Sequence, residues 1–107
     1  MFGLKKRNKI TSAEVKTMIE NKESFLLIDV RRPEEFMSGH IRLAKNIPNY
    51  SIDGRIINKI KNRDQKIVVY CHTGSRARGS ARRLTKFGYT NVYNLGGLLK
   101  WPYDLTR

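Results

Sequence analysis

Cys71 opens a short polar stretch, Cys71-His72-Thr73-Gly74-Ser75-Arg76, whose residue types suit nucleophilic chemistry on an anion. The stretch lies between an apolar, β-branched run and a pattern typical of a helix. A cysteine in that position faces backbone N–H groups without partners in the helix, together with the positive end of the helix dipole. Both stabilise a thiolate, the nucleophilic form of cysteine. Gly74 lets the loop turn its N–H groups inward, and Arg76 adds a permanent charge that can hold an oxyanion.

A lone cysteine after a strand is by default a small buried hydrophobic residue, so the case for chemistry depends on its neighbours. Glycine, serine and arginine follow Cys71 and are themselves followed by a helix start, which favours an anion cradle over an ordinary core turn. His72 has the chemistry of an acid or base, but a side chain next to a nucleophile in sequence often points away from it. We therefore interpret His72 mainly as part of the loop.

Strands and helices alternate along the chain around this loop. Apolar stretches predict strands at residues 25–30, 44–47, 66–70 and 91–95. Helical spacing of apolar or small residues predicts helices over residues 11–21, from Pro33 to Gly39, around 52–60 and from Ala77 to Gly88, with a last helix or turn at 98–101. This alternation predicts an α/β fold with a mostly parallel central sheet and helices on both faces. Ligands bind at the carboxyl ends of the strands in such sheets, and Cys71 falls at one of these ends.

The 107 residues suit one domain, and the charge is strongly unbalanced. With 22 Lys and Arg against 9 Asp and Glu, the formal net charge of +13 favours anionic partners, although it also fits simple solubility. We expect residues 1–9, which are polar and basic, to be a flexible N-terminal arm and residues 10–107 to form the domain. The single cysteine, the lack of a signal-peptide pattern and the lack of any membrane-length apolar stretch favour a cytoplasmic protein.

The motifs on either side of the loop resemble those of rhodanese domains. The resemblance runs from about Ile10 to Trp101 in the order and spacing of that family, through residues 27–36, Gly39-His40-Ile41, Ala44, Asn46-Ile47-Pro48, residues 71–77, Asn94-Leu95-Gly96-Gly97 and Trp101. It implies a single rhodanese-like domain that acts as a thiosulfate-type sulfurtransferase. The sequence departs from the family pattern at Arg42-Leu43, where Pro-Gly is usual, and at Pro102, which directly follows Trp101.

The resemblance also implies a role for each site residue. Cys71 would attack the outer sulfur of a donor such as thiosulfate, and sulfite would leave. The resulting persulfide would pass its sulfur to cyanide in the assay or to a thiol in the cell. The persulfide would lie in the loop formed by His72, Thr73, Gly74, Ser75 and Arg76. Asp29 and Arg31 would support that loop. The Asp29 carboxylate can either pair with a loop arginine or cap the next turn, and the sequence leaves both open.

Loop length separates this chemistry from related reactions. Phosphatases and arsenate reductases of the same architecture have a longer loop between cysteine and arginine, whereas only four residues, 72–75, separate them here. The narrower ring suits a single sulfur atom on the cysteine. Because the chain has no second cysteine, a Cys71 persulfide needs an external thiol or protein acceptor.

The alternative is a non-catalytic rhodanese-like module that uses its basic surface to engage an acidic partner. The intact loop argues against this alternative. Nucleic acid is a less favoured partner because no aromatic residues are interleaved with the basic ones. We expect a monomer that needs neither a cofactor nor a metal.

Overall fold

The computed structural model describes residues 8–107 and shows an α/β fold built on four parallel strands. These are β1 (Leu26–Asp29), β2 (Lys45–Asn46), β3 (Ile67–Cys71) and β4 (Val92–Gly97), arranged in the order β2-β1-β3-β4. All three strand pairs are parallel, and β3 lies between β1 and β4. The predicted fold class is therefore confirmed, with a sheet that is parallel throughout.

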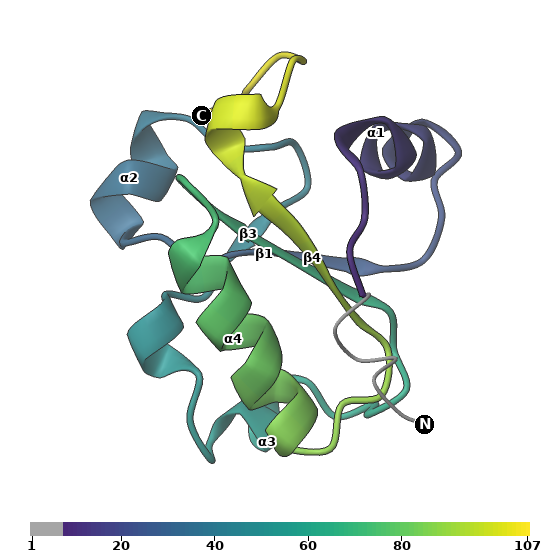
Figure 1. The fold of residues 1–107 in the computed structure, drawn as a ribbon, viewed down its shortest axis with the longest axis vertical. Helices are drawn as coiled ribbons and strands as arrows, with labels where there is room; N and C mark the ends of the chain where they lie inside the picture. The colour runs from purple at the N-terminus through teal and green to yellow at the C-terminus, as the bar shows by residue number, and fades with distance from the viewer. Residues whose placement is uncertain (1–7) are drawn as a thin grey trace.

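Four α-helices and two short 3-10 turns connect and cover the strands (Figure 1). The helices are α1 (Ser12–Glu20), α2 (Pro33–Ser38), α3 (Ile56–Lys59) and α4 (Ser75–Lys86), and the 3-10 turns are η2 (Asn49–Ser51) and η3 (Leu98–Lys100). The helix predicted around residues 52–60 is only the four-residue α3. The cause is a turn in which the backbone N–H of Arg55 donates to the Asp53 carboxylate, so the helix begins only after it.

Apolar side chains cover both faces of the central strands, which explains why their sequences are continuously apolar. One face of the sheet packs against α1, and the side chains of Leu27, Val68 and Tyr70 belong to the apolar cluster on that face. The other face packs against α3 and α4, and its cluster includes Ile28, Val69 and Cys71. Figure 1 shows α1 and α4 on opposite sides of the strands. Burying each large apolar side chain contributes about 1.5–3 kcal/mol, so the sheet is a rigid base for whatever lies at its end.

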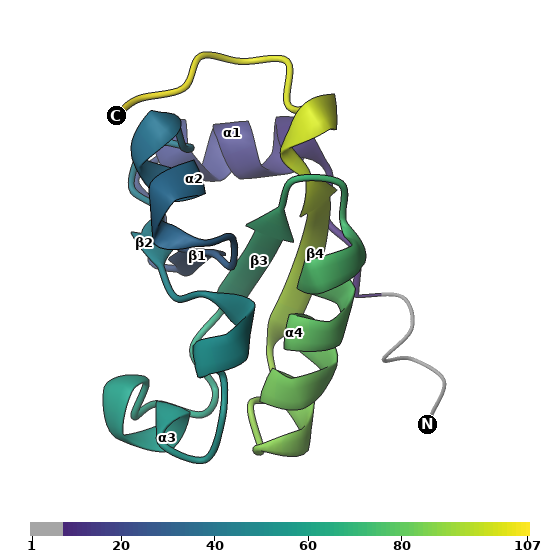
Figure 2. The same ribbon diagram turned by 90° about the vertical axis from the view of Figure 1, so that its left-hand side faces the viewer.

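The carboxyl ends of β3 and β4 point to the same end of the molecule, where β3 turns into α4 and β4 runs into η3 (Figure 2). The register between these strands shifts after Val69, so that Tyr70 is opposite Gly96 and Cys71 is opposite Gly97. Cys71 is thus the last residue of β3, whereas the sequence placed it just after the strand.

The start of the chain differs from the predicted arm of residues 1–9. Asn8 and Lys9, assigned to the arm, pair with β4, since the Asn94 N–H donates to the Asn8 carbonyl and the Ile10 N–H donates to the Asn94 carbonyl. The folded part therefore includes Asn8, and the rest of the predicted arm lies outside the described residues. Within residues 8–107, no helix is long and apolar enough to cross a membrane.

Candidate active site

The Cys71 thiol lies at the end of β3, where two backbone N–H groups point at it. Its Sγ accepts hydrogen bonds from the N–H of Gly74, at 3.0 Å, and of Ala77, at 3.4 Å. Ala77 belongs to the first turn of α4, where backbone N–H groups have no carbonyl partner within the helix. The side chain of Cys71 is fully buried, while His72, Thr73 and Ser75 are exposed. The sulfur thus sits beneath an exposed loop, in an environment of N–H donors that favours negative charge.

Two glycines allow the loop to close around the sulfur. Gly74 has a φ of 113°, a left-handed conformation that turns its N–H toward Sγ and that other residues adopt only with strain. Gly97 permits a close approach instead, because a Cβ there would lie 2.5 Å from the His72 carbonyl oxygen and 2.8 Å from the Thr73 Cα. The loop therefore rests directly on the backbone of β4.

Arg76 holds the loop to α2 and has a different partner from the one expected. Its two terminal nitrogens donate to the Glu35 carboxylate at 2.8 and 3.1 Å, forming a bidentate ion pair that is about three-quarters buried on both sides. The hydrogen bonds from Arg76 lower the pKa of Glu35 from 4.5 to about 2. The guanidinium fork that the sequence suggested for an oxyanion is thus occupied by a carboxylate.

Asp29 and Arg31 form a buried ion pair beneath α2. The Arg31 side chain donates to the Asp29 carboxylate, with a shortest distance of 2.7 Å, and also to the Gly39 carbonyl at 2.6 Å. The Asp29 carboxylate in addition accepts the backbone N–H of Arg31, so it caps the turn after β1. Of the two roles left open for Asp29, the structure shows the cap, and the arginine it pairs with is Arg31 on its own segment.

Among the described residues, the hydrogen bonds of the Asp29 and Arg31 side chains join these two residues and Gly39, and none reaches residues 72–76. Arg31 ties the end of β1 to the end of α2 at Gly39, and α2 presents Glu35 to Arg76. Tyr70 is the register partner of Asp29 on β3, and its hydroxyl oxygen accepts the Ile41 N–H. Burial, reinforced by the Asp29 charge, raises the pKa of Tyr70, so its phenol stays neutral. These contacts fix the end of the sheet that carries Cys71.

Sequence reasoning missed Glu35 and Gly97 as parts of the site. Glu35 lies in the first turn of α2, where its carboxylate accepts the Arg32 N–H. Its second role depends on a contact with a residue 41 positions away. The sequence carries no local signal for this pair, because the carboxylate approaches Arg76 from another element. Gly97 stands in a Gly-Gly pair, which often marks a close approach of two backbones.

Comparisons with known proteins agree with this geometry. The sequence model described as Rhodanese-like domain matches residues 11–103. The thiosulfate sulfurtransferase PspE of Escherichia coli (strain K12) is 37% identical over 71 residues, which cover 66% of this chain and 68% of PspE. The protein YqhL of Bacillus subtilis (strain 168) is 45% identical over 76 residues, covering 70% of this chain but 59% of YqhL. A solved rhodanese with anions from E. coli superposes with a TM-score of 0.71 at 31% identity, over 78% of this chain and 99% of that chain.

Proposed function

The chain belongs to the rhodanese-like domain family, and we propose that it moves sulfane sulfur from a small anionic donor such as thiosulfate to a thiol acceptor through a Cys71 persulfide. The predicted class of enzyme, a rhodanese-type sulfurtransferase, agrees with the name of its relative PspE. The observation that carries the mechanism is the pair of backbone N–H groups, of Gly74 and Ala77, that donate to the buried Cys71 Sγ.

The first half-reaction loads the enzyme. The Cys71 thiolate attacks the outer sulfur of thiosulfate, a new S–S bond forms, and the bond within thiosulfate breaks so that sulfite leaves with the electron pair. In the second half-reaction an acceptor thiolate attacks the outer sulfur of the persulfide. Cys71 then leaves as a thiolate, ready for another cycle. The sulfane sulfur changes partners twice, so no external oxidant or reductant is required.

The loop would stabilise the charged species of both half-reactions. The N–H groups of Gly74 and Ala77 point at Sγ in advance, so they need no reorganisation when negative charge develops on sulfur. Arg76 would act as a positioning residue, because its ion pair with Glu35 fixes the first turn of α4, which carries the Ala77 N–H. Asp29 and Arg31 support α2 from below. Since Cys71 is the only cysteine, discharge depends on an acceptor outside the chain.

Intact-protein mass spectrometry tests this proposal. Incubation with thiosulfate should add the mass of one sulfur atom, and cyanide or a small thiol should remove it. The Cys71→Ser variant should acquire no sulfur under the same conditions. A matched control is Ser80→Ala, since Ser80 is also buried but lies on α4 away from the loop. Persistence of the adduct in Cys71→Ser, or its absence in the folded wild type, would contradict the mechanism and favour a non-catalytic module.

A further inference from the structure

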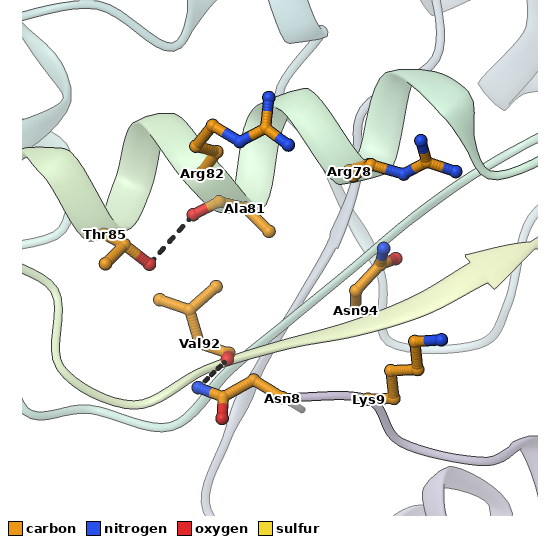
Figure 3. Close-up of a pocket in the computed structure, with 8 residues that line it drawn as sticks. All are labelled: Asn8, Lys9, Arg78, Ala81, Arg82, Thr85, Val92 and Asn94. Carbon is orange, nitrogen blue, oxygen red and sulfur yellow. Dashed lines mark hydrogen bonds between the residues drawn. The ribbon is translucent and has the colours of Figure 1, made fainter. Parts of the chain in front are cut away.

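A basic groove lies between α4 and the edge of the sheet, outside the site described so far. Its volume is about 330 Å³, within the lower range of small-ligand cavities. One wall is the exposed side of α4 and the other is formed by β4 and the segment that pairs with it (Figure 3). We refer to this hollow as the α4–β4 groove. Its polar lining comes from Asn8, Lys9, Arg78, Arg82, Thr85 and Asn94.

Three cations line this groove with no anion to offset them. Lys9, Arg78 and Arg82 take part in none of the ion pairs found among residues 8–107, and no carboxylate lines the groove. Arg78 and Arg82 are four residues apart, so they emerge on the same face of α4, one helical turn from each other. Mutual repulsion of these like charges destabilises the unliganded groove, and an anion between them relieves it.

The neutral groups of the groove also have spare hydrogen-bonding capacity. The Asn94 side-chain oxygen accepts the Gly96 N–H, which leaves its NH2 group available as a donor, and Figure 3 shows this amide rising from β4 toward the helix. Asn8 uses its NH2 group on the Val92 carbonyl. Ala81 supplies a small apolar patch between the polar groups, and Val92 beside it is only 2% exposed. The groove thus combines three cationic side chains without ion-pair partners among residues 8–107 with a small apolar surface.

We propose that the α4–β4 groove binds a small organic phosphate of nucleotide size that carries at least two phosphoryl groups. Each guanidinium can hold one phosphoryl group through a bidentate contact, and the Lys9 ammonium adds a point charge on the β4 side of the groove. The remainder of the ligand packs against the apolar patch. A monovalent anion would satisfy only one of the three cations, which is why the proposal requires several phosphoryl groups.

This site is separate from sulfur transfer, so it can be tested without any activity measurement. The probe is ATP, with inorganic pyrophosphate as the fragment that isolates the phosphoryl contribution. Titration of the full chain is followed by NMR chemical shifts of backbone amides and by calorimetry. We expect the largest shifts at Ala81, Thr85 and Asn94, and weaker binding of pyrophosphate at the same amides.

A pair of double variants separates a built site from diffuse positive charge. Arg78→Gln/Arg82→Gln removes two groove cations and should weaken ATP binding at least tenfold. Lys59→Gln/Lys86→Gln removes the same charge from exposed positions outside the groove and should change affinity less than twofold. Equal weakening in both variants, or shifts spread over the surface, would overturn the proposal. Tighter binding of an acidic peptide or a short RNA than of ATP at these amides would also overturn it.

Discussion

At the scale of one residue, Gly97 is the place where the backbone of β4 lies directly against the loop that follows Cys71. A methyl group at this position would overlap the His72 carbonyl oxygen and the Thr73 Cα, which belong to the backbone and cannot rotate away. We expect Gly97→Ala to displace the loop, to lower the free energy of unfolding by about 1–3 kcal/mol and to slow persulfide formation. Urea unfolding and thiosulfate mass labelling measure the two effects.

Gly54 provides the matched control for that substitution, since a Cβ there meets no atom within 4 Å. Gly54→Ala should leave both stability and sulfur loading close to those of the wild type. A Gly97→Ala protein that loads sulfur at the wild-type rate would show that the loop tolerates a shift away from β4.

Leu43 has a left-handed backbone conformation at a position where rhodanese domains usually have glycine. Its φ of 77° is left-handed and its side chain is 60% exposed, so it has backbone strain without much burial to offset it. Glycine is usual at this place in the rhodanese pattern. We expect Leu43→Gly to raise the free energy of unfolding by about 0.5–1 kcal/mol, because relief of strain exceeds the entropy cost of glycine. Chemical denaturation measures the change.

Leu99→Gly is the control for Leu43, because Leu99 is 69% exposed and has a negative φ. There the same substitution relieves no strain, and it should lower stability. If both variants lose stability, the conformation of Leu43 carries no strain in solution.

At the scale of elements, the ion pair between Glu35 and Arg76 joins α2 to the start of α4. The pKa of Glu35 in the folded protein, about 2, lies below its ordinary value of 4.5. The pair therefore stabilises the fold fully above about pH 4.5, and this contribution is lost as the pH falls toward 2. We expect Glu35→Gln to lower stability at pH 7 by roughly 1 kcal/mol and to reduce the loss of stability on acidification.

The Asp53→Asn variant is the control for the pH dependence of Glu35→Gln. Arg55 lowers the pKa of Asp53 to about 2 as well, but that pair is exposed and joins neighbouring residues. Both variants should therefore flatten the acid limb of the unfolding curve, whereas only Glu35→Gln should slow sulfur loading at pH 5. Equal loading rates in the two variants would argue against a positioning role for Glu35.

Elements with strong local signals could be predicted from sequence, and those that depend on distant contacts could not. The run from β3 through Gly74 into α4 was predictable because a buried strand, a glycine and a helix pattern follow one another directly. The pairing of Asn8 and Lys9 with β4 was not, since it requires knowing which strand forms the edge of the sheet. The same limit hid the partner of Arg76, which approaches from another element.

At the scale of the whole molecule, the formal charge of +13 acts on a chain whose Cα radius of gyration is only 12.8 Å over residues 8–107. At an ionic strength of about 0.01 M the Debye length is about 30 Å, so charges repel across the entire fold. At about 0.15 M it is about 8 Å, and only neighbouring charges interact. The unfolded chain is more expanded and repels itself less at low salt, so repulsion lowers the stability of the folded state.

We therefore expect sodium chloride to stabilise this protein. Raising the salt concentration from about 0.01 to about 0.15 M should increase the free energy of unfolding by about 1 kcal/mol, or the Tm by about 4 °C. Lys59→Gln/Lys86→Gln should be more stable than the wild type at low salt, and the difference should shrink as salt is added. A fold dominated by favourable ion pairs would respond in the opposite direction, because salt weakens exposed pairs. A falling Tm would thus show that pairs such as Glu35–Arg76 outweigh the net repulsion.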